Sequence, residues 1–135
     1  MRNPFRPGDT KTYVSVVTAA DFAVLNGQLI HRVLGTFALG RDLEWTSRQF
    51  VEEMLEAGEE GIGTLLHIEH RAPAFEGEIV KFQAIFEQLQ GQELICRVEA
   101  WVGERLVATG RTGQRIVASE KLRARFAQLR PKQQL

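Results

Sequence analysis

The sequence has one cysteine, no long apolar run and no net charge. A single thiol, Cys96, excludes an internal disulfide and any metal site built from several cysteines, so a reduced cytoplasmic setting is expected. The longest stretch without Asp, Glu, Lys or Arg is 22–31, which is far too short to cross a bilayer. Residues 1–8 contain no apolar signal core, so neither export nor a membrane partner is predicted.

The charges balance, with 17 Lys and Arg against 17 Asp and Glu. A nucleic-acid-binding module of this size would carry a strong positive field, so no nucleic-acid partner is expected. The composition is 44% hydrophobic and 25% charged, which is ordinary for a globular protein. A chain of 135 residues can bury a core without disulfides, and we predict a single domain spanning residues 1–135.

The hydrophobic pattern changes period along the chain. A β-branched first strand is predicted at 11–18, and an ambiguous segment, 21–34, has the turn signal Asn26-Gly27 at its middle. A long helix follows at 37–57, with one apolar stripe and with Gly58 placed to end it. Strands joined by short connections that contain glycine are then predicted at 64–71, 78–89, 93–102 and 105–118.

A short final helix completes the pattern, with Ser119 as its N-cap and Pro131 at its end. The order is one strand, one long helix and four strands expected to form a meander. The stripe of the long helix has only the sheet to pack against. We therefore predict an α+β fold in which a five-stranded antiparallel sheet wraps around a central helix, which is the hotdog architecture.

Two ionisable side chains are predicted near the apolar face. Alternation along 64–71 places His70 on the side where the helix packs, together with Thr64, and places His67 on the opposite side. Glu44 lies at the edge of the helical stripe, where partial burial raises the basicity of a carboxylate. Both have structural alternatives: a core histidine bonded to a carbonyl, and a glutamate paired with Arg48 at i+4.

Two further residues have both a structural and a functional interpretation. Thr36 directly precedes the predicted helix and could be its N-cap, or it could place a hydroxyl beside the positive end of the helix dipole. Gly63 either makes a turn or permits close backbone approach to a ligand. Each signal is weak when taken alone.

Together these residues resemble a known family. The segments 36–45 and 63–70 are similar to the fluoroacetyl-CoA thioesterase-like branch of the hotdog superfamily, in which a Thr and a Glu eight residues later, and a Gly and a His seven residues later, form the active site. Thr36 with Glu44, and Gly63 with His70, have these spacings. The similarity continues in pattern from Pro73 to 115–117, so it covers most of the chain.

The resemblance implies a thioesterase that hydrolyses an acyl-CoA. Glu44 and His70 would activate either water or the Thr36 hydroxyl, and backbone N–H groups near the helix start or near Gly63 would bind the oxyanion. No cofactor or metal is implied, since CoA is part of the substrate. The fluoroacetyl-specific enzyme has aromatic lid residues where this sequence has Gly27 and Ile30, so another short or medium acyl group is expected.

Two other residues invite a functional interpretation. Cys96 alternates with apolar residues of its strand, so we interpret it as a small buried side chain and not as a nucleophile. Trp45 falls among the polar positions of the helix and is either an interface residue or one covered by 21–34. Hotdog proteins usually pair, so a homodimer, with a higher homo-oligomer as the alternative, is expected.

The zero net charge conceals a segregation. Acids gather in 42–60 and bases in 111–132, including Lys132. Two solvated faces explain such runs, but Arg111 and Arg115 share a strand face and could also bind the phosphates of CoA. A non-catalytic acyl-CoA-binding or ligand-sensing protein is the alternative function. A dehydratase is disfavoured because the strands contain no Asp/His hydratase motif.

Overall fold

The computed structural model describes residues 1–131, so Lys132 and the last three residues lie outside the described part. Its elements are β1 (Thr10–Val16), the 3₁₀ turn η1 (Ala19–Asp21), β2 (Phe22–Leu25), β3 (Gln28–Leu34), α1 (Thr36–Met54), β4 (Glu59–His70), β5 (Ile79–Gln90), β6 (Glu93–Val102), β7 (Arg105–Ala118) and α2 (Ser119–Leu129). Within residues 1–131, no helix has the length and apolarity that a membrane span requires.

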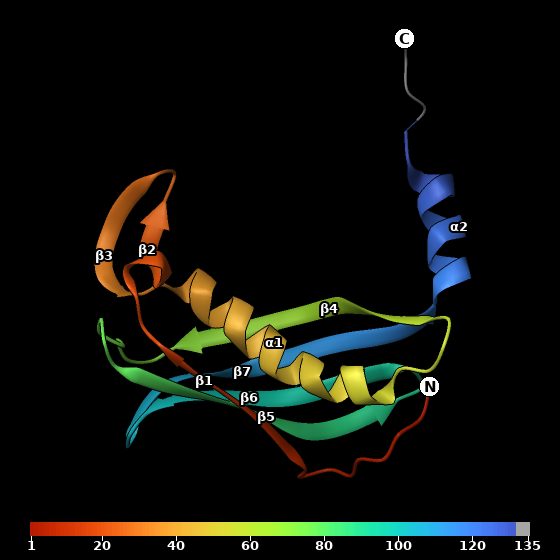
Figure 1. The fold of residues 1–135 in the computed structure, drawn as a ribbon, viewed down its shortest axis with the longest axis horizontal. Coiled ribbons are helices and arrows are strands. Elements are labelled where there is room, and N and C mark those ends of the chain that lie inside the picture. The colour runs from red at the N-terminus through yellow and green to blue at the C-terminus, as the bar shows by residue number, and fades with distance from the viewer. Residues whose placement is uncertain (132–135) are drawn as a thin grey trace.

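The predicted α+β fold is confirmed. Five antiparallel strands form one sheet in the order β1-β5-β6-β7-β4, and α1 lies along one face of that sheet (Figure 1). The predicted helical stripe faces the sheet, and its four members are completely buried: Leu39, Leu43, Phe50 and Met54. Burial of this stripe is the main reason that the helix and the sheet stay together.

The predicted four-strand meander is wrong in one respect. Only β5, β6 and β7 are consecutive neighbours, whereas β4 pairs with β7 and forms an edge of the sheet. The segment 71–78 is not a tight turn, because Arg71 donates its N–H to Val107 and Gly77 donates its N–H to Val17. It carries the chain past the ends of the intervening strands to β5, which leaves one side of β4 free of a partner within residues 1–131.

The helix boundaries differ from the predicted ones. Gly35, not Thr36, is the N-cap of α1, and Thr36 is its first residue. The helix ends at Met54 with Leu55 as C-cap, so Gly58 does not cap it. Gly58 instead has φ +79° in the turn that leads to β4. At the other end of the chain, Ala118 and not Ser119 is the N-cap of α2.

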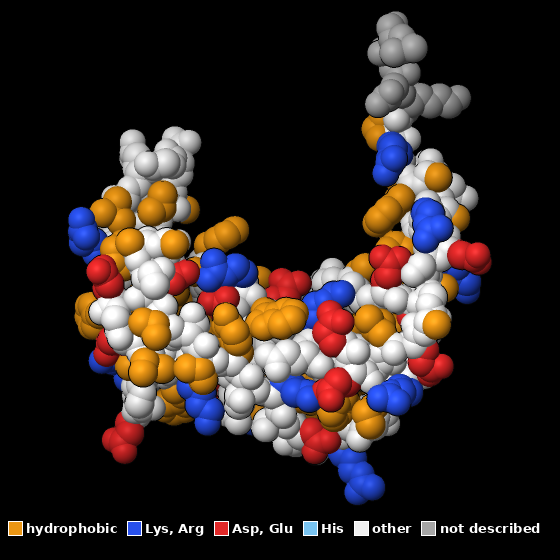
Figure 2. Space-filling view, viewed as in Figure 1, with side chains coloured by type: hydrophobic (Ala, Val, Ile, Leu, Met, Phe, Trp, Pro, Cys, Tyr) orange, Lys and Arg blue, Asp and Glu red, His pale blue; other side chains and the backbone are white. Residues whose placement is uncertain are grey.

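Two arms rise from opposite ends of the molecule. The ambiguous segment 21–34 forms the β2–β3 hairpin, which turns at Asn26 and Gly27, both with positive φ. The second arm is α2, which extends from the end of β7 (Figure 1). Both arms project on the β4 side of the sheet and give the molecule the outline of a U, with a hollow between them (Figure 2).

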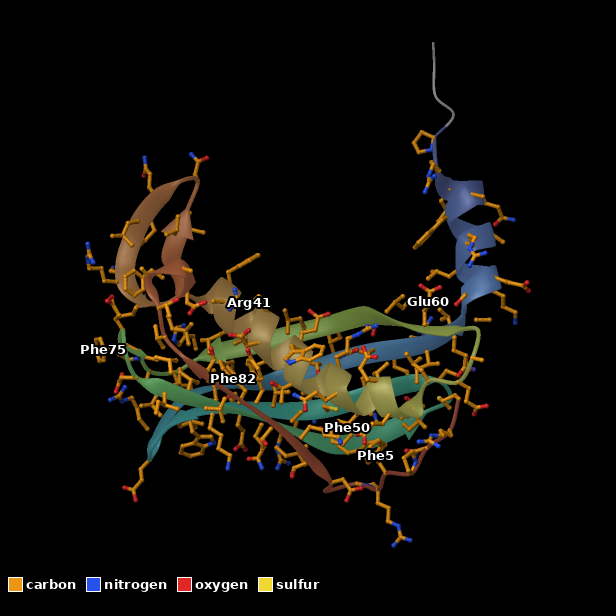
Figure 3. All side chains as sticks on the ribbon, viewed as in Figure 1. Phe5, Arg41, Phe50, Glu60, Phe75 and Phe82 are labelled. Atoms are coloured by element: carbon orange, nitrogen blue, oxygen red, sulfur yellow. The ribbon has the colours of Figure 1, made fainter. Side chains whose placement is uncertain are left out.

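Aromatic packing anchors the C-terminal half of α1. The Phe50 ring is fully buried, and it meets Phe5 and Phe86 edge-on with ring centroids 4.9 and 5.7 Å away. Figure 3 labels Phe5 and Phe50 on the same side of the sheet. A buried polar contact adds a second attachment, because the Thr112 hydroxyl on β7 donates to Ser47 of α1 over 2.7 Å.

The interpretation of Cys96 as a core residue is confirmed. Its side chain is completely buried on β6. Burial, together with the negative charge of Glu87, raises the pKa of the thiol to about 12, although hydrogen bonds with Thr112 and Ser47 act in the opposite direction. The thiol is therefore neutral and unreactive at physiological pH.

Removing the Phe50 ring should destabilise the protein strongly. A Phe50→Ala substitution leaves a cavity between α1, the N-terminal segment and β5, and such changes cost about 3–5 kcal/mol. Urea unfolding followed by circular dichroism measures the loss. Phe75→Ala is the control, since that ring is half exposed and should cost less than about 1 kcal/mol. Equal losses for the two variants would contradict this packing.

Alkylation of Cys96 should be very slow in the folded protein. At pH 8, raising the pKa from 9.0 to about 12 lowers the thiolate fraction about 1,000-fold, and burial blocks access as well. Iodoacetamide labelling followed by mass spectrometry should show reaction in urea and almost none in buffer. A thiol added at the exposed position Gln128 serves as the control. Cys96 labelling as fast as that thiol would refute the assignment.

Candidate active site

Thr36 and His70 form a hydrogen-bonded pair between α1 and β4. The Thr36 hydroxyl oxygen and Nδ1 of His70 lie 2.9 Å apart. Because the N-cap is a glycine, no side chain caps the start of this helix, and the Thr36 hydroxyl is directed to the imidazole instead. Both residues are exposed. The pair therefore lies at the positive end of the α1 dipole, where solvent or a ligand can reach it.

Glu44 and Gly63 form a second contact between the same two elements. A Cβ atom on Gly63 would lie 2.5 Å from Oε1 of Glu44, closer than real Cβ atoms approach, so any larger residue here would displace the carboxylate. Glu44 is half-buried, and Gln114 on β7 donates its side-chain N–H to the Glu44 backbone carbonyl over 3.3 Å. The glycine thus allows the carboxylate to lie against the backbone of β4.

A bulge in β4 puts Gly63 and His70 on the same face. Residues seven apart on a regular strand point to opposite faces. In β4, however, Gly63 is opposite Gln114 and Leu65 is opposite Gly113, so Thr64 is an extra residue. The Thr64 side chain bonds to Glu93 on the outer face, whereas Leu66 and His70 face α1. The prediction that Thr64 shares the face of His70 is therefore wrong. The prediction that His70 lies on the side where the helix packs is confirmed.

The two pairs lie at separate places on one pocket wall. Eight residues of α-helix separate Thr36 from Glu44, a rise of about 12 Å along the axis. Among the described residues, no hydrogen bond joins the Glu44 carboxylate to Thr36 or His70. A pocket of about 860 Å³ nevertheless borders both Thr36 and Glu44, and its other lining residues are Phe37, Gly40, Arg41, Trp45, Arg48, Leu66 and Ile68.

A smaller apolar groove of about 330 Å³ adjoins the first turn of α1. The β2–β3 hairpin forms one wall through Val24, Leu25 and Ile30, and the helix start forms the other through Thr36 and Phe37. The Phe37 side chain is 87% exposed, an unusual exposure for a large aromatic ring. The groove lies beside the Thr36 hydroxyl and can hold a short apolar group.

Arg111 and Arg115 are not brought together with these residues. Along β7, Thr112 and Gln114 face α1, so the two arginines point to the opposite face of the sheet. Each is ion-paired there, Arg111 with Glu87 and Arg115 with Glu93, both over 2.9 Å. Binding of CoA phosphates by this pair stays a prediction that no contact in the structure supports. His67 lies on the outer face too, as predicted, in a shallow pocket with Arg111.

The structure adds pocket residues that the sequence analysis did not select. Arg41 bonds to Asp21 over 3.0 Å and to Asp42 over 3.0 Å, and these bonds raise its pKa (Figure 3). Desolvation opposes ionisation of Asp21, but bonds from the Thr18 backbone and Arg41 outweigh it and lower the Asp21 pKa. Gln114 does not line the pocket, but it is a further residue behind it, since a glutamine on the inward face of a strand signals a buried polar contact and this one bonds to the Glu44 carbonyl.

The ionisable groups do not gather as metal ligands. Within residues 1–131, no three His, Cys, Asp or Glu side chains cluster closely enough to hold an ion. Trp45 is 45% exposed and borders the pocket, so the segment 21–34 does not cover it. The chemistry available at the pocket is therefore that of a hydroxyl, an imidazole and a carboxylate beside a helix N-terminus.

Comparison with known proteins identifies solved structures with the same fold. A hypothetical protein of Thermus thermophilus, described as a thioesterase superfamily member, superposes with a TM-score of 0.87 at 31% identity over 93% of both chains. The fluoroacetyl-CoA thioesterase FlK superposes with a TM-score of 0.85 at 24% identity, over 96% of this chain and 100% of its own. A hot-dog-like protein from Thermanaerovibrio acidaminovorans gives 0.86 at 19% identity, over 95% and 96% of the two chains.

No curated protein matches the chain at the threshold used. The family model of the fluoroacetyl-CoA-specific thioesterases, however, matches residues 17–120, which include the whole pocket and most of the sheet. With the fold and the relative from Thermus thermophilus, this match shows that the chain belongs to the fluoroacetyl-CoA-specific thioesterase family and is a thioesterase of the hotdog fold.

Proposed function

We propose that the protein hydrolyses a short- or medium-chain acyl-CoA to the free acid and CoA, with Thr36, Glu44 and His70 as the reacting side chains. The observation that carries the proposal is the 2.9 Å contact between the Thr36 hydroxyl and His70 at the mouth of an apolar groove. A hydroxyl paired with an imidazole is the arrangement that activates a nucleophile. Side chains alone perform this chemistry, so we propose no cofactor.

His70 is the proton acceptor for the attacking group. Its ring takes a proton either from Thr36, which then forms an acyl ester that water hydrolyses, or from a water molecule held by the Thr36 hydroxyl. In both routes the carbonyl carbon gains an oxygen, the C–S bond breaks, and the CoA thiolate recovers the proton. The contact supports either route, because Thr36 and His70 are paired in both.

The start of α1 provides the place for the developing oxyanion. Its first-turn N–H groups point toward Thr36, and the N-cap glycine has no side chain to occupy them. These dipoles stabilise negative charge on the thioester oxygen without any reorganisation. The backbone at Gly63, against which the Glu44 carboxylate lies, is the second candidate for this role.

We propose that the enzyme is a homodimer joined along β4. Within residues 1–131 this strand has a free edge, and its Leu65 and Leu66 side chains are each 47% exposed. Such an edge is a ready site for pairing with another strand. Antiparallel pairing of two β4 edges brings the His70 end of one strand toward the Glu59 end of the other. The Glu44–Gly63 contact of the second copy then approaches the Thr36–His70 pair of the first.

The acyl pocket favours a small substituent. The groove beside Thr36 holds about 330 Å³ and is lined by aliphatic side chains such as Val24 and Ile30. At Gly27 and Ile30 the hairpin contributes no aromatic ring to close the groove, although Phe22 and Phe37 line it elsewhere. We therefore propose a short or medium acyl group other than fluoroacetyl. Location in the cytoplasm stays a prediction.

Substitution of the three reacting residues should abolish turnover. We expect Glu44→Gln, Thr36→Val and His70→Ala each to lower kcat/KM for the preferred acyl-CoA about 10²–10⁴-fold, the usual contribution of a general base or its partner. Thiol release across acyl-CoA chain lengths measures this. Glu53→Gln, on the outer side of α1, is the matched control. Saturable acyl-CoA binding without thiol release by the unmodified protein would instead indicate a binding protein.

Adding one methyl group at Gly63 should act through Glu44. In Gly63→Ala, the new Cβ displaces the carboxylate and should lower kcat at least about tenfold. In a Glu44→Gln background the same substitution should cost much less, because the group that it displaces is already inactive. A double-mutant cycle on kcat tests this. Fully additive losses would show that Gly63 acts independently of Glu44.

A further inference from the structure

The two arms of the U carry apolar side chains that no other part of residues 1–131 covers. None of the side chains of Ser119–Leu129 is buried within residues 1–131. Its apolar stripe consists of Leu122, Phe126 and Leu129, of which Phe126 is 52% and Leu129 62% exposed. The opposite arm, the β2–β3 hairpin, exposes Val24, Leu25, Leu29 and Ile30 to a similar extent. Figure 2 shows hydrophobic side chains on both arms.

Neither arm is stable by itself. A helix of 11 residues is marginal in water, since most helical stability in proteins comes from packing of the apolar face. A two-stranded hairpin is similarly marginal unless its face is covered. The hairpin packs on the start of α1 only at its base, where Phe22 and Leu34 are buried. Both arms therefore require a partner surface that is apolar.

Symmetric pairing of two copies supplies that surface. Ala118, the residue before α2, is opposite Glu59, so α2 begins at the start of β4. The hairpin leads directly into Thr36, whose side chain contacts His70, so the hairpin stands at the end of β4. Antiparallel pairing of β4 with a second β4 reverses this order. It places the α2 arm of each copy beside the hairpin arm of the other.

We propose that α2 of a second copy packs its stripe on the β2–β3 hairpin and closes the apolar groove beside Thr36. The proposal rests on the dimer and the acyl pocket described above. In a single chain the groove is open to solvent next to the exposed Phe37 ring. With Phe126 and Leu129 of the second copy over it, the acyl group lies in an enclosed apolar site, and the partner's helix limits its length.

The buried area supports a second copy as the occupant. The six side chains (Val24, Leu25, Leu29, Ile30, Phe126 and Leu129) are each about half exposed. At roughly 80–100 Å² each they leave on the order of 500 Å² of apolar surface per copy, from the sizes of large apolar side chains. Two symmetric contacts would thus cover on the order of 1,000 Å², the size expected of a specific interface. A single two-fold rotation generates both contacts between α2 and the hairpin, as closed symmetry requires.

Cross-linking between two different single-cysteine variants tests the proposal. Leu29→Cys and Phe126→Cys chains, carrying different tags, are co-expressed, and the mixed dimer is treated with a short bismaleimide. The buried Cys96 does not compete for the reagent. We expect a covalent dimer at least tenfold more abundant than from either variant alone, because like positions lie far apart in the proposed arrangement. Gln128→Cys, on the other side of α2, replaces Phe126→Cys in the matched control.

Four results would overturn the proposal. Three are equal cross-linking of the Gln128→Cys control, equal cross-linking of each variant alone, and no cross-link in a mixed sample that sedimentation shows to be dimeric. A chain carrying both cysteines that links only to itself would show that α2 folds over its own hairpin, which also overturns it. Thiol release from acyl-CoA, measured on the unmodified protein, tests the proposed function separately, because cross-linking does not depend on turnover.

Discussion

The close approach of α1 to β4 is the constraint on which the pocket depends. Two glycines of β4 permit it: a Cβ on Gly61 would lie 2.5 Å from Val51, and one on Gly63 would lie 2.5 Å from the Glu44 carboxylate. Gly40 on the helix allows a similar contact with Leu66, at 3.1 Å. A larger residue at position 61 would press on the buried Val51 side chain, and one at position 63 would displace the Glu44 carboxylate. The carboxylate would then lose its position against the β4 backbone.

The same contact explains why Thr36 and His70, the proposed reacting groups, lie at an exposed edge. The helix is held over the middle of the sheet by Phe50 and by the buried bond between Ser47 and Thr112. Its first two residues, Thr36 and Phe37, are exposed beside this core at the end of β4, where Thr36 meets His70. The core thus holds the helix rigidly while its N-terminus remains open, as a site for an acyl thioester requires.

Much of this arrangement was predictable from the sequence, because period and spacing are local. The stripe of α1, the strands β5 to β7 and the orientation of His70 all follow from residues a few positions apart. The pairing of β4 with β7 could not be predicted, because the segment 71–78 resembles a hairpin connection. The bulge at Thr64 could not be predicted either, because a change of register depends on the opposite strand. Without that bulge, Gly63 and His70 could not both face α1.

In the proposed dimer, sheet topology determines where the second copy pairs. Had β4 lain inside the sheet, both sides of the strand would be paired, and the Thr36–His70 pair would be covered by the chain itself. As an edge strand, β4 instead carries its free hydrogen-bonding groups and its reacting residues to the same border. The distance of about 12 Å between Thr36 and Glu44 along α1 then does not prevent the two residues from acting together. In the proposed dimer, two-fold symmetry can bring Thr36 of one copy close to Glu44 of the other, which a single chain cannot do.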